Sequence, residues 1–444
     1  MEKTEKTDRY ADKAGGEARG KTLMEPSETA DRAGGEARGK TLMEQPEAAD
    51  RAGGEARGQT LIEQPETADR AGGGARGKTL IEPSETAEAA DTAGGEARGM
   101  TLMEPSETAE TAGEKIPVAV VGLGRIAGLL EDDLLREKPC THTGAVTANE
   151  HCVLAAGSDT DESRRGLFAE RWGCPVYADA DAMLRDLRPG ILIIATHPDS
   201  HAAYCALAAS RGVPVAVCEK PLADTLKDAR RIADIHRRGA VTILTNHERR
   251  YAEDYVRAKA LLGEERLGRL LRVRAVLSMG AGRRLLDVFW HDATHLADAL
   301  MFLTDARLKH ERIWGASLKA REGTTLLAGR LESPGRTVPF TLELEAGPDH
   351  LVFELEFSAE KGRLRIGNGV FEVWESAPSP YAKGFRSLRR TGETFEGPTG
   401  YFANMIQDAV LCVRDPAREP RSSALDGLAV IEYLHSVKPW GRFV

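Results

Sequence analysis

The sequence predicts an α/β protein with a doubly wound parallel sheet, followed by a region of antiparallel strands. A buried apolar strand runs into a Gly-x-Gly-x-x-Ala turn at residues 116–127. Apolar runs and amphipathic helical patterns then alternate up to residue 246, as in successive β-α units. Beyond residue 270, apolar residues alternate with polar ones, which is typical of antiparallel strands with one buried face.

The first 114 residues are repetitive. A 19-residue unit recurs, with copies that start at Ala14, Ala33, Ala52, Ala71 and Ala93. Each copy offers Leu and one Met or Ile, which is too little to bury a seam between stacked repeats. Because the entropy lost on ordering such a chain costs more free energy than the burial of these side chains supplies, we expect residues 1–114 to be disordered. Two alternatives stay open: a repeated docking motif that gains avidity, and translation from Met100 or Met103.

Charge is distributed unevenly along the chain. Residues 1–114 hold 25 acidic and 15 basic side chains, a net charge of −10, whereas the whole chain carries −9. The remainder is therefore close to neutral, without the field that nucleic-acid binding needs. No apolar run approaches the roughly 18 residues of a membrane span, and the N-terminus lacks the apolar core of a secretory signal. With six cysteines at unpaired spacings, we expect a cytoplasmic protein with reduced thiols, and neither nucleic acid nor membrane as partner.

The first half of the remaining sequence predicts a dinucleotide site. Its expected strands lie at residues 116–121, 152–157, 191–195, 214–218 and 241–245. After the first of them, Gly122 permits a tight turn, Gly124 has no Cβ to block a diphosphate, and Ala127 lets helix and strand pack closely. A helix that begins here would offer free N–H groups to the diphosphate, so Arg125 and Ile126 are further candidate cofactor contacts.

Asp159 ends the second strand, where a carboxylate can accept hydrogen bonds from the ribose hydroxyls of NAD. The alternative is a helix N-cap. Arg164 and Arg165 leave room for the 2′-phosphate of NADP, so NADP is possible too. The separation between Gly124 and Asp159 exceeds the usual ~20 residues, and we assign the excess to an insertion at residues 131–150. Within it, His142 belongs to a structured loop or reaches the active site.

Polar residues follow two later strands at the sheet edge where ligands of α/β proteins bind. They are Thr196, His197, Pro198 and His201 after one strand, and Glu219, Lys220 and Pro221 after the next. A lysine directly after a buried strand indicates a functional role. Its alternative is an ion pair with Glu219.

The second half reads as a helix at 251–262 followed by alternating strands. The clearest strands are residues 270–277, 340–345 and 351–357. In the last of these, Leu351, Phe353, Leu355 and Phe357 share one face, as expected for a strand buried on one side.

Four features together resemble one known family. Gly122-x-Gly124-x-x-Ala127, Ala195-Thr-His-Pro, Glu219-Lys-Pro221 and a downstream His-bearing helix are similar to the glucose-fructose oxidoreductase/inositol dehydrogenase (Gfo/Idh/MocA) family. The resemblance covers about residues 115–444. It implies a Rossmann domain at 115–246 and an α+β domain with a large open, mostly antiparallel sheet at 247–444. It also implies NAD(P)-dependent hydride transfer on sugars or polyols, and assembly into homodimers or homotetramers through the sheet.

The resemblance assigns roles to residues after the Rossmann half. His295 matches the active-site histidine that exchanges a proton with the substrate hydroxyl, for which a pKa near neutrality is suited. The family more often places Asp four residues earlier, where this chain has His291. Asp292 is therefore our candidate orienting partner, and His291 a candidate substrate contact. Two alternatives are a zinc site that imitates His-Glu-x-x-His and a structural histidine pair.

Three further residues complete the predicted site. Lys220 would hydrogen-bond the reacting oxygen. Arg250 and Tyr251 lie where the two domains should meet and would bind sugar hydroxyls or a carboxylate, with interdomain salt bridging as an equal alternative. The turn that holds His197 and His201 packs against the nicotinamide ribose in the family, with helix capping or a metal pair as alternatives. The leading interpretation is a dehydrogenase without a bound metal. The alternative is a non-catalytic NAD-sensing regulator or scaffold that uses the repeat for partner binding.

Overall fold

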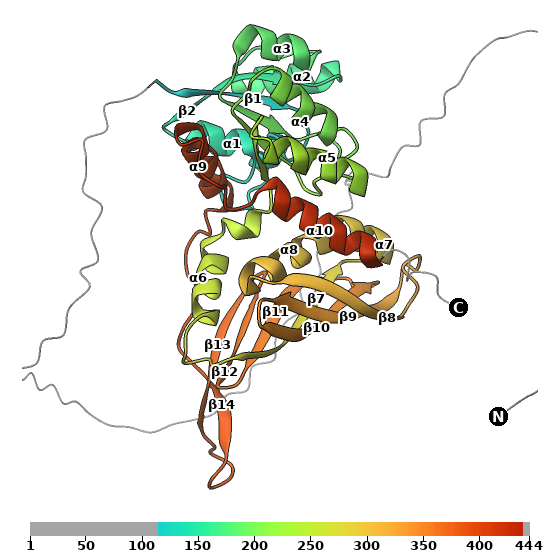
Figure 1. The fold of residues 1–444 in the computed structure, drawn as a ribbon, viewed down its shortest axis with the longest axis vertical. Coiled ribbons are helices and arrows are strands. Elements are labelled where there is room, and N and C mark those ends of the chain that lie inside the picture. Colours follow the sequence, from blue (N-terminus) through green and yellow to red (C-terminus); the bar gives the residue numbers. More distant parts are fainter. Residues whose placement is uncertain (1–113, 438–444) are drawn as a thin grey trace, which may run out of the picture. The chain divides into compact units, whose positions relative to one another are not determined.

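The computed structural model describes residues 114–437 (Figure 1). The predicted disorder of the repeat concerns residues outside this range, apart from Glu114. The first sheet has six parallel strands in the order β3-β2-β1-β4-β5-β6. They are β1 (Ile116–Val121), β2 (Cys152–Ser158), β3 (Val176–Tyr177), β4 (Ile191–Ile194), β5 (Val215–Cys218) and β6 (Thr242–Thr245). The doubly wound sheet is therefore confirmed, and the strand that the sequence did not predict, β3, has two residues.

Helices connect these strands and cover the sheet. They are α1 (His142–Ala148), α2 (Glu162–Trp172), α3 (Ala180–Leu187), α4 (His201–Ser210) and α5 (Leu226–Arg237). The N-cap of α2 is Asp161, whose carboxylate accepts a hydrogen bond from the N–H of Arg164. The alternative that made Asp159 this N-cap is therefore wrong.

The helix expected directly after the glycine-rich turn is interrupted. A short 3₁₀ helix, η1 (Leu129–Asp132), and a loop come first. The N–H of His142, at the start of α1, then donates to the carbonyl of Ile126 at 3.1 Å, and the N–H of Thr143 donates to that of Ala127 at 2.9 Å. The first turn of the helix thus lies in the glycine-rich segment, and α1 continues it after an excursion. The insertion predicted at 131–150 is wrong at its end, because residues 142–148 are helical.

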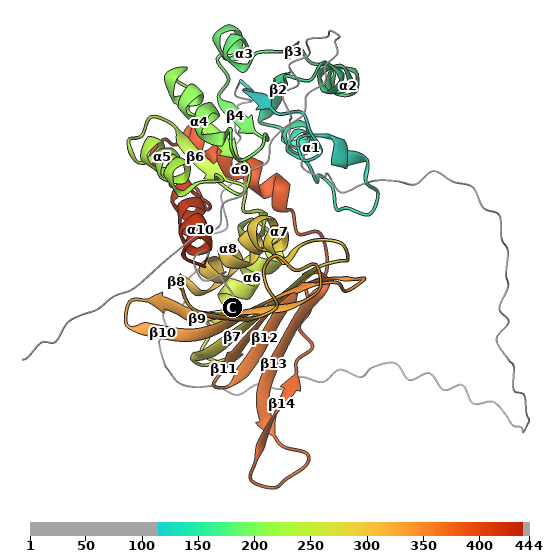
Figure 2. The same ribbon diagram turned by 90° about the vertical axis from the view of Figure 1, so that its right-hand side faces the viewer.

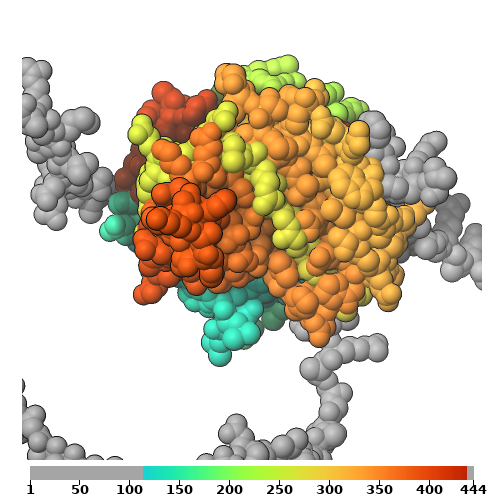
Figure 3. Space-filling model, turned by 90° about the horizontal axis from the view of Figure 1, so that it is seen from below, coloured from blue at the N-terminus to red at the C-terminus, as the bar shows by residue number. Residues whose placement is uncertain are grey.

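The second sheet has eight strands in the order β14-β13-β12-β11-β7-β10-β9-β8. They are β7 (Leu270–Met279), β8 (Arg307–Gly315), β9 (Gly323–Ser333), β10 (Arg336–Ala346), β11 (Leu351–Ala359), β12 (Gly362–Gly367), β13 (Val370–Pro378) and β14 (Arg386–Arg390). Neighbours are antiparallel except β7 and β10, which are parallel. Figure 3 shows β7 as a yellow stripe between orange strands.

Helices α6 (Glu253–Leu262) and α8 (Ala293–Thr304) pack with the buried side chains of this sheet in one hydrophobic core. Phe353, Leu355 and Phe357 of β11 are buried as predicted, whereas Leu351 is 52% exposed at the start of the strand. None of the helices within residues 114–437 is long and apolar enough to cross a membrane.

The last two helices return to the first sheet. In α9 (Tyr401–Arg414), Phe402 and Met405 share a core with Val118 and Val120 of β1. Helix α10 (Ala424–Val437) contacts α5 on one side and α8 on the other (Figures 1 and 2). The core of the first sheet therefore includes residues far beyond the predicted boundary at 246.

Candidate active site

Two glycines shape the turn after β1 in different ways. Gly122 has a φ of +85°, and a Cβ there would lie 2.7 Å from the carbonyl carbon and oxygen of Ala195. Only glycine therefore allows the turn to approach the end of β4 so closely. Gly124 is different, because the nearest atom to its Cβ position is an Arg164 guanidinium nitrogen at 4.0 Å. The space beside Gly124 is open, and this cradle fits a diphosphate.

Asp159 is tied to this turn. One carboxylate oxygen accepts from the N–H of Leu123 at 2.8 Å, and the other accepts from the N–H of Asp161 at 2.9 Å. Arg164 lies 4.0 Å away, and Arg165 donates to the backbone carbonyl of Asp159. The carboxylate thus stands beside the glycine-rich turn, where its predicted ribose contact requires it. Arg164 is the nearer of the two arginines to this space.

The turn after β4 lies next to Gly122, through the side chain of Thr196. His197 is exposed, Pro198 is half-buried, and the hydroxyl of Thr196 is 2.7 Å from that of Ser200. His201 is fully buried, with its ring nitrogens 3.0 Å from the carbonyl oxygen of Thr196 and 3.2 Å from that of Leu222. Burial lowers the pKa of His201. The prediction that His201 contacts the cofactor is wrong, because its ring is enclosed and holds the turn.

Glu219 is also enclosed by protein groups. Its carboxylate accepts from Nε2 of His142 at 2.7 Å and from the side-chain amide of Asn246 at 2.6 Å. Burial alone would raise the pKa of Glu219, but these hydrogen bonds and the charges of His142 and Lys220 hold it below its usual range. The predicted cofactor contact of Glu219 is not supported, because this residue is 6% exposed and its carboxylate is hydrogen-bonded to His142 and Asn246. His142 is thus a helical residue whose side chain contacts Glu219, the residue before Lys220.

Lys220 meets the histidine-bearing segment of the second half. Its ammonium group donates to the backbone carbonyl of His291 at 3.2 Å. The segment comprises α7 (Leu285–Asp287), a π-helical turn η3 (Val288–Asp292) and then α8. The helix type therefore changes between His291 and His295, so the two rings do not share the regular α-helical face that a zinc site imitating His-Glu-x-x-His would need.

His295 lies in this partly buried position. Its side chain is 14% exposed. Burial, with the positive charges of Lys220 and Arg249 and that of His247, holds its pKa well below the usual range. Asp292 is 2.8 Å from the guanidinium group of Arg283. Glu248 is instead the carboxylate near His295, with Oε1 3.8 Å from Nδ1. No sequence motif marks Glu248 as a functional residue, and the prediction of Asp292 as orienting partner is not supported.

Arg250 and Tyr251 do not face this space. Both are buried, and the Arg250 guanidinium group pairs with Asp298 of α8 and Asp426 of α10 at 2.9 and 3.1 Å. The hydroxyl of Tyr251 donates to Asp408 at 3.1 Å. The predicted substrate contact is therefore wrong for these two residues, and Arg250 instead forms ion pairs with two helices of the second half.

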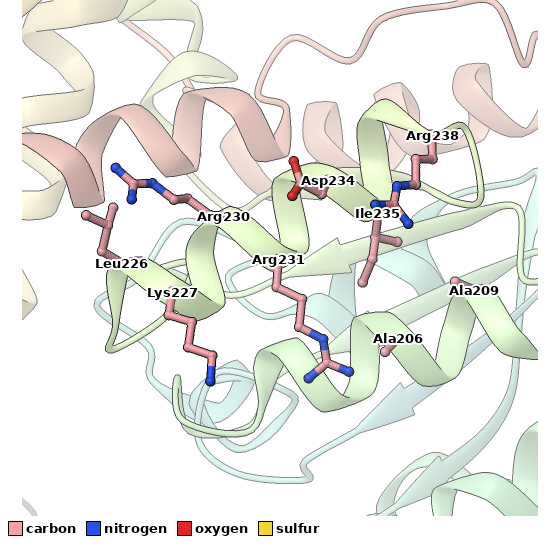
Figure 4. A pocket seen from close by; sticks show the side chains of 9 residues that line it. All are labelled: Ala206, Ala209, Leu226, Lys227, Arg230, Arg231, Asp234, Ile235 and Arg238. Carbon is pink, nitrogen blue, oxygen red and sulfur yellow. The ribbon is translucent and has the colours of Figure 1, made fainter.

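A separate hollow of about 600 Å³ lies between α4 and α5 (Figure 4). Its lining combines Ala206, Ala209, Leu226 and Ile235 with Lys227, Arg230, Arg231, Asp234 and Arg238. None of the predicted site residues lines it. Among residues 114–437, no three or more His, Cys, Asp or Glu side chains are placed to hold a metal ion.

Comparison with known proteins identifies the family. Residues 116–247 match the model of the Gfo/Idh/MocA oxidoreductases, described as an oxidoreductase family with an NAD-binding Rossmann fold. The first half of the described chain is a Gfo/Idh/MocA-type Rossmann domain. The family match ends just after β6, at His247, and so contains the glycine-rich turn, Asp159 and Lys220. The resemblance in the sequence motifs is thereby confirmed.

Individual relatives are distant. Inositol 2-dehydrogenase 2 of Saccharopolyspora erythraea is 30% identical over 161 residues, 36% of this chain and 44% of that protein. D-apiose dehydrogenase of Rhizobium rhizogenes is 30% identical over 116 residues, 26% of this chain and 33% of that protein. The chain thus spans less than half the length of these curated relatives. The crystal structure of GenD2 from gentamicin A biosynthesis, in complex with NAD, matches with a TM-score of 0.57 at 18% identity. That match covers 74% of this chain and 95% of GenD2, and it confirms the fold of both halves.

Proposed function

We propose that the protein is an NAD(P)-dependent oxidoreductase that transfers a hydride between nicotinamide and a secondary alcohol or ketone of a sugar, polyol or derivative. One observation carries the proposal. Lys220, after the carboxyl end of β5, donates to the backbone carbonyl of His291, and after burial its charge is the next cause of the low pKa of His295. A proton donor and a proton acceptor from separate halves of the chain are thus brought to the sheet edge where Rossmann domains bind their cofactors.

The cofactor would lie along the carboxyl ends of β1, β2 and β4. Gly122, Gly124, Arg125 and Ile126 would hold the diphosphate, and Asp159 the adenosine ribose. The turn at 196–198 would lie on the nicotinamide side. Asp159 favours NAD, and Arg164, 4.0 Å from that carboxylate, keeps NADP possible. When bound, the cofactor accepts or supplies the hydride.

The two catalytic side chains would divide the remaining chemistry. Lys220 donates a hydrogen bond to the reacting oxygen and stabilises negative charge as it develops there. His295 is neutral at pH 7 because its pKa is low, so in the oxidation direction it can accept the proton that the hydroxyl loses. In the reduction direction the protonated imidazole returns that proton to the oxygen.

The charges around the site favour an uncharged, hydroxyl-rich substrate. Arg249 pairs with Glu248 at 3.0 Å, and Arg283 pairs with Asp292 at 2.8 Å, so both guanidinium groups already have carboxylate partners. The relatives' names, an inositol and an apiose dehydrogenase, support the same substrate class. His291, which is exposed beside Lys220, remains our candidate substrate contact. Homo-oligomers through the second sheet also remain a proposal.

The test begins with calorimetric titration of NAD⁺, NADH, NADP⁺ and NADPH into the full chain, followed by a polyol and sugar screen. We expect micromolar binding of one cofactor pair and turnover of at least one polyol. Lys220→Ala should lower kcat by about 10²–10³-fold while cofactor binding persists. Lys227→Ala, on α5, is the matched control. Cofactor binding with turnover unchanged in Lys220→Ala would contradict the proposed chemistry and favour an NAD sensor.

A further inference from the structure

Glu248 occupies a position beside His295 that the mechanism above does not use. It begins the 3₁₀ helix η2 (Glu248–Arg250), which follows β6, whereas His295 is on α8. The carboxylate oxygen Oε1 is 3.8 Å from Nδ1 of the imidazole, within ion-pair range and longer than a hydrogen bond. Such contacts between catalytic groups are often long in a structure without substrate and shorten when the substrate binds.

We propose that Glu248 is the positioning residue of His295: it accepts a hydrogen bond from Nδ1–H and thereby presents Nε2 to the reacting oxygen. This inference rests on the proposed function. A histidine that uses Nε2 as base must carry its proton on Nδ1, and a carboxylate at Nδ1 fixes that tautomer and the ring orientation. Glu248 acts through His295 and does not itself contact the reacting atoms.

The carboxylate is held from its other side. A guanidinium nitrogen of Arg249 lies 3.0 Å from Oε1 of Glu248. The Arg249 guanidinium carbon is itself 3.7 Å from the ring centroid of Phe353, on strand β11 of the second sheet. This cation–π contact fixes the arginine against the sheet, so the sheet, the arginine and the carboxylate form a support that ends at His295.

Asp292 has a different partner. Its carboxylate pairs with Arg283 at 2.8 Å, and burial raises its pKa. Asp292 is the last residue of the π-helical turn and directly precedes α8, the helix that bears His295. The orienting carboxylate of this chain therefore comes from the segment after β6 and not from the histidine's own helix.

The charged groups that face His295 have opposite effects on its protonation. Lys220, Arg249 and His247 lower the pKa of His295 after the effect of burial. The negative charge of Glu248, from η2, acts in the opposite sense and favours the protonated ring. Removing that charge should therefore lower the pKa of His295 further. Removing the acceptor should end the preference for the Nδ1–H tautomer.

The test reads the tautomer of His295 directly, by ¹⁵N NMR of the full chain labelled in histidine, with His295→Asn to assign the signal among the 11 histidines. We expect the Nδ1–H tautomer in the wild type and in Glu248→Gln, whose amide oxygen can still accept. Glu248→Leu should shift His295 to the other tautomer or a mixture. Asp292→Ala and Glu170→Leu, on exposed α2, are matched removals of a carboxylate and should leave the tautomer unchanged. Turnover should fall at least tenfold in Glu248→Leu, with KM for the cofactor within twofold, and recover in Glu248→Gln.

Two results would overturn the proposal: the Nε2–H tautomer in the wild type, or the wild-type tautomer retained in folded Glu248→Leu. If Glu248→Leu does not fold, the pKa of His295 in Glu248→Gln is the test. The loss of the negative charge must lower that pKa, and an unchanged pKa would overturn the proposal. The NMR measurement needs neither cofactor nor substrate. A failure of this inference is therefore distinguishable from a failure of the proposed function, which would appear as absent cofactor binding in the wild type.

Discussion

The two glycines of the turn after β1 should respond differently to the same added methyl group. Alanine at Gly122 must adopt a φ of +85°, which costs about 1–3 kcal/mol for a residue with a side chain. Its Cβ would also lie 2.7 Å from backbone atoms of Ala195, so strand β4 or the turn must move. Overpacking of this kind adds about 1–3 kcal/mol. We expect Gly122→Ala to lower the free energy of unfolding by about 2–6 kcal/mol.

Alanine at Gly124 meets neither problem. Its φ is not in the left-handed region, and the nearest atom to its Cβ is the Arg164 guanidinium nitrogen at 4.0 Å. We therefore expect Gly124→Ala to keep the free energy of unfolding within about 0.5 kcal/mol of the wild type. The added Cβ would nevertheless fill the space through which the backbone approaches a diphosphate. We expect NAD(H) to bind at least tenfold more weakly.

Urea unfolding followed by circular dichroism gives the first quantity, and calorimetric titration of NADH gives the second. Each variant serves as the control for the other, because both add one methyl group within three residues of sequence. The reasoning would be refuted if Gly124→Ala bound NADH like the wild type, since the open space would then not be the diphosphate site. A Gly122→Ala variant as stable as the wild type would refute the steric argument for the turn.

Further predictions concern His295 and the buried ion pair between Arg250 and Asp298. His295→Asn should lower kcat by about 10²–10⁴-fold. Because the pKa of His295 lies well below its ordinary value of about 6.5, alcohol oxidation by the wild type should persist at pH 6, as a pH profile of kcat/KM would show. A loss of activity centred at pH 6.5 would contradict this. Arg250→Met breaks the buried pair with Asp298 and should cost about 3–5 kcal/mol in urea unfolding. Burial raises the pKa of Asp298, but the charges of Arg250 and His247 outweigh it and hold the pKa below its ordinary value. The stability from this pair is therefore present above about pH 4 and lost as pH falls further, so the wild type and Arg250→Met should converge there.

The parts of the fold that the sequence predicted are those in which local pattern and burial agree. Strands β1, β4 and β5 are continuous apolar runs buried between helices, so their sequences alone predict buried strands. Strand β8 contains no such run, and most of its residues are exposed or half-buried. Its place at the edge of the second sheet depends on backbone pairing with the next strand, β9, and not on the burial of its own side chains.

The same distinction applies to the site. Lys220 could be predicted because a strand end fixes where the next residue lies. The sequence does not distinguish Arg250 from Arg249, because three residues form one turn of a 3₁₀ helix and neighbours point in different directions. Only the packed structure shows that Arg250 turns inward to Asp298 while Glu248 approaches His295.

The loop between the glycine-rich turn and α1 leads to one more prediction. In a regular helix the carbonyl of Ile126 would accept from residue 130, and here it accepts from His142, while Gly128 already donates to Gly124. His142 thus takes the place of residue 130, and twelve residues, 130–141, are looped out of an otherwise continuous helix. Without them the separation of Gly124 and Asp159 falls from 35 to 23 residues, close to the usual ~20.

Deleting residues 130–141 should therefore join the two parts of the helix in register. The deletion removes Glu137, whose carboxylate accepts from the N–H groups of Thr399 and Gly400 at the start of α9. We expect a loss of about 1–3 kcal/mol in the free energy of unfolding from those unpaired donors. Binding of NADH should stay within about threefold of the wild type, because residues 122–129 are retained and the first turn loses only the N–H of Leu130, which donates to the carbonyl of Arg125. A deletion of residues 129–139, which leaves the helix one residue out of register, is the matched control and should bind NADH more weakly. Equal binding by both deletions would show that helical register after the turn does not hold the cofactor.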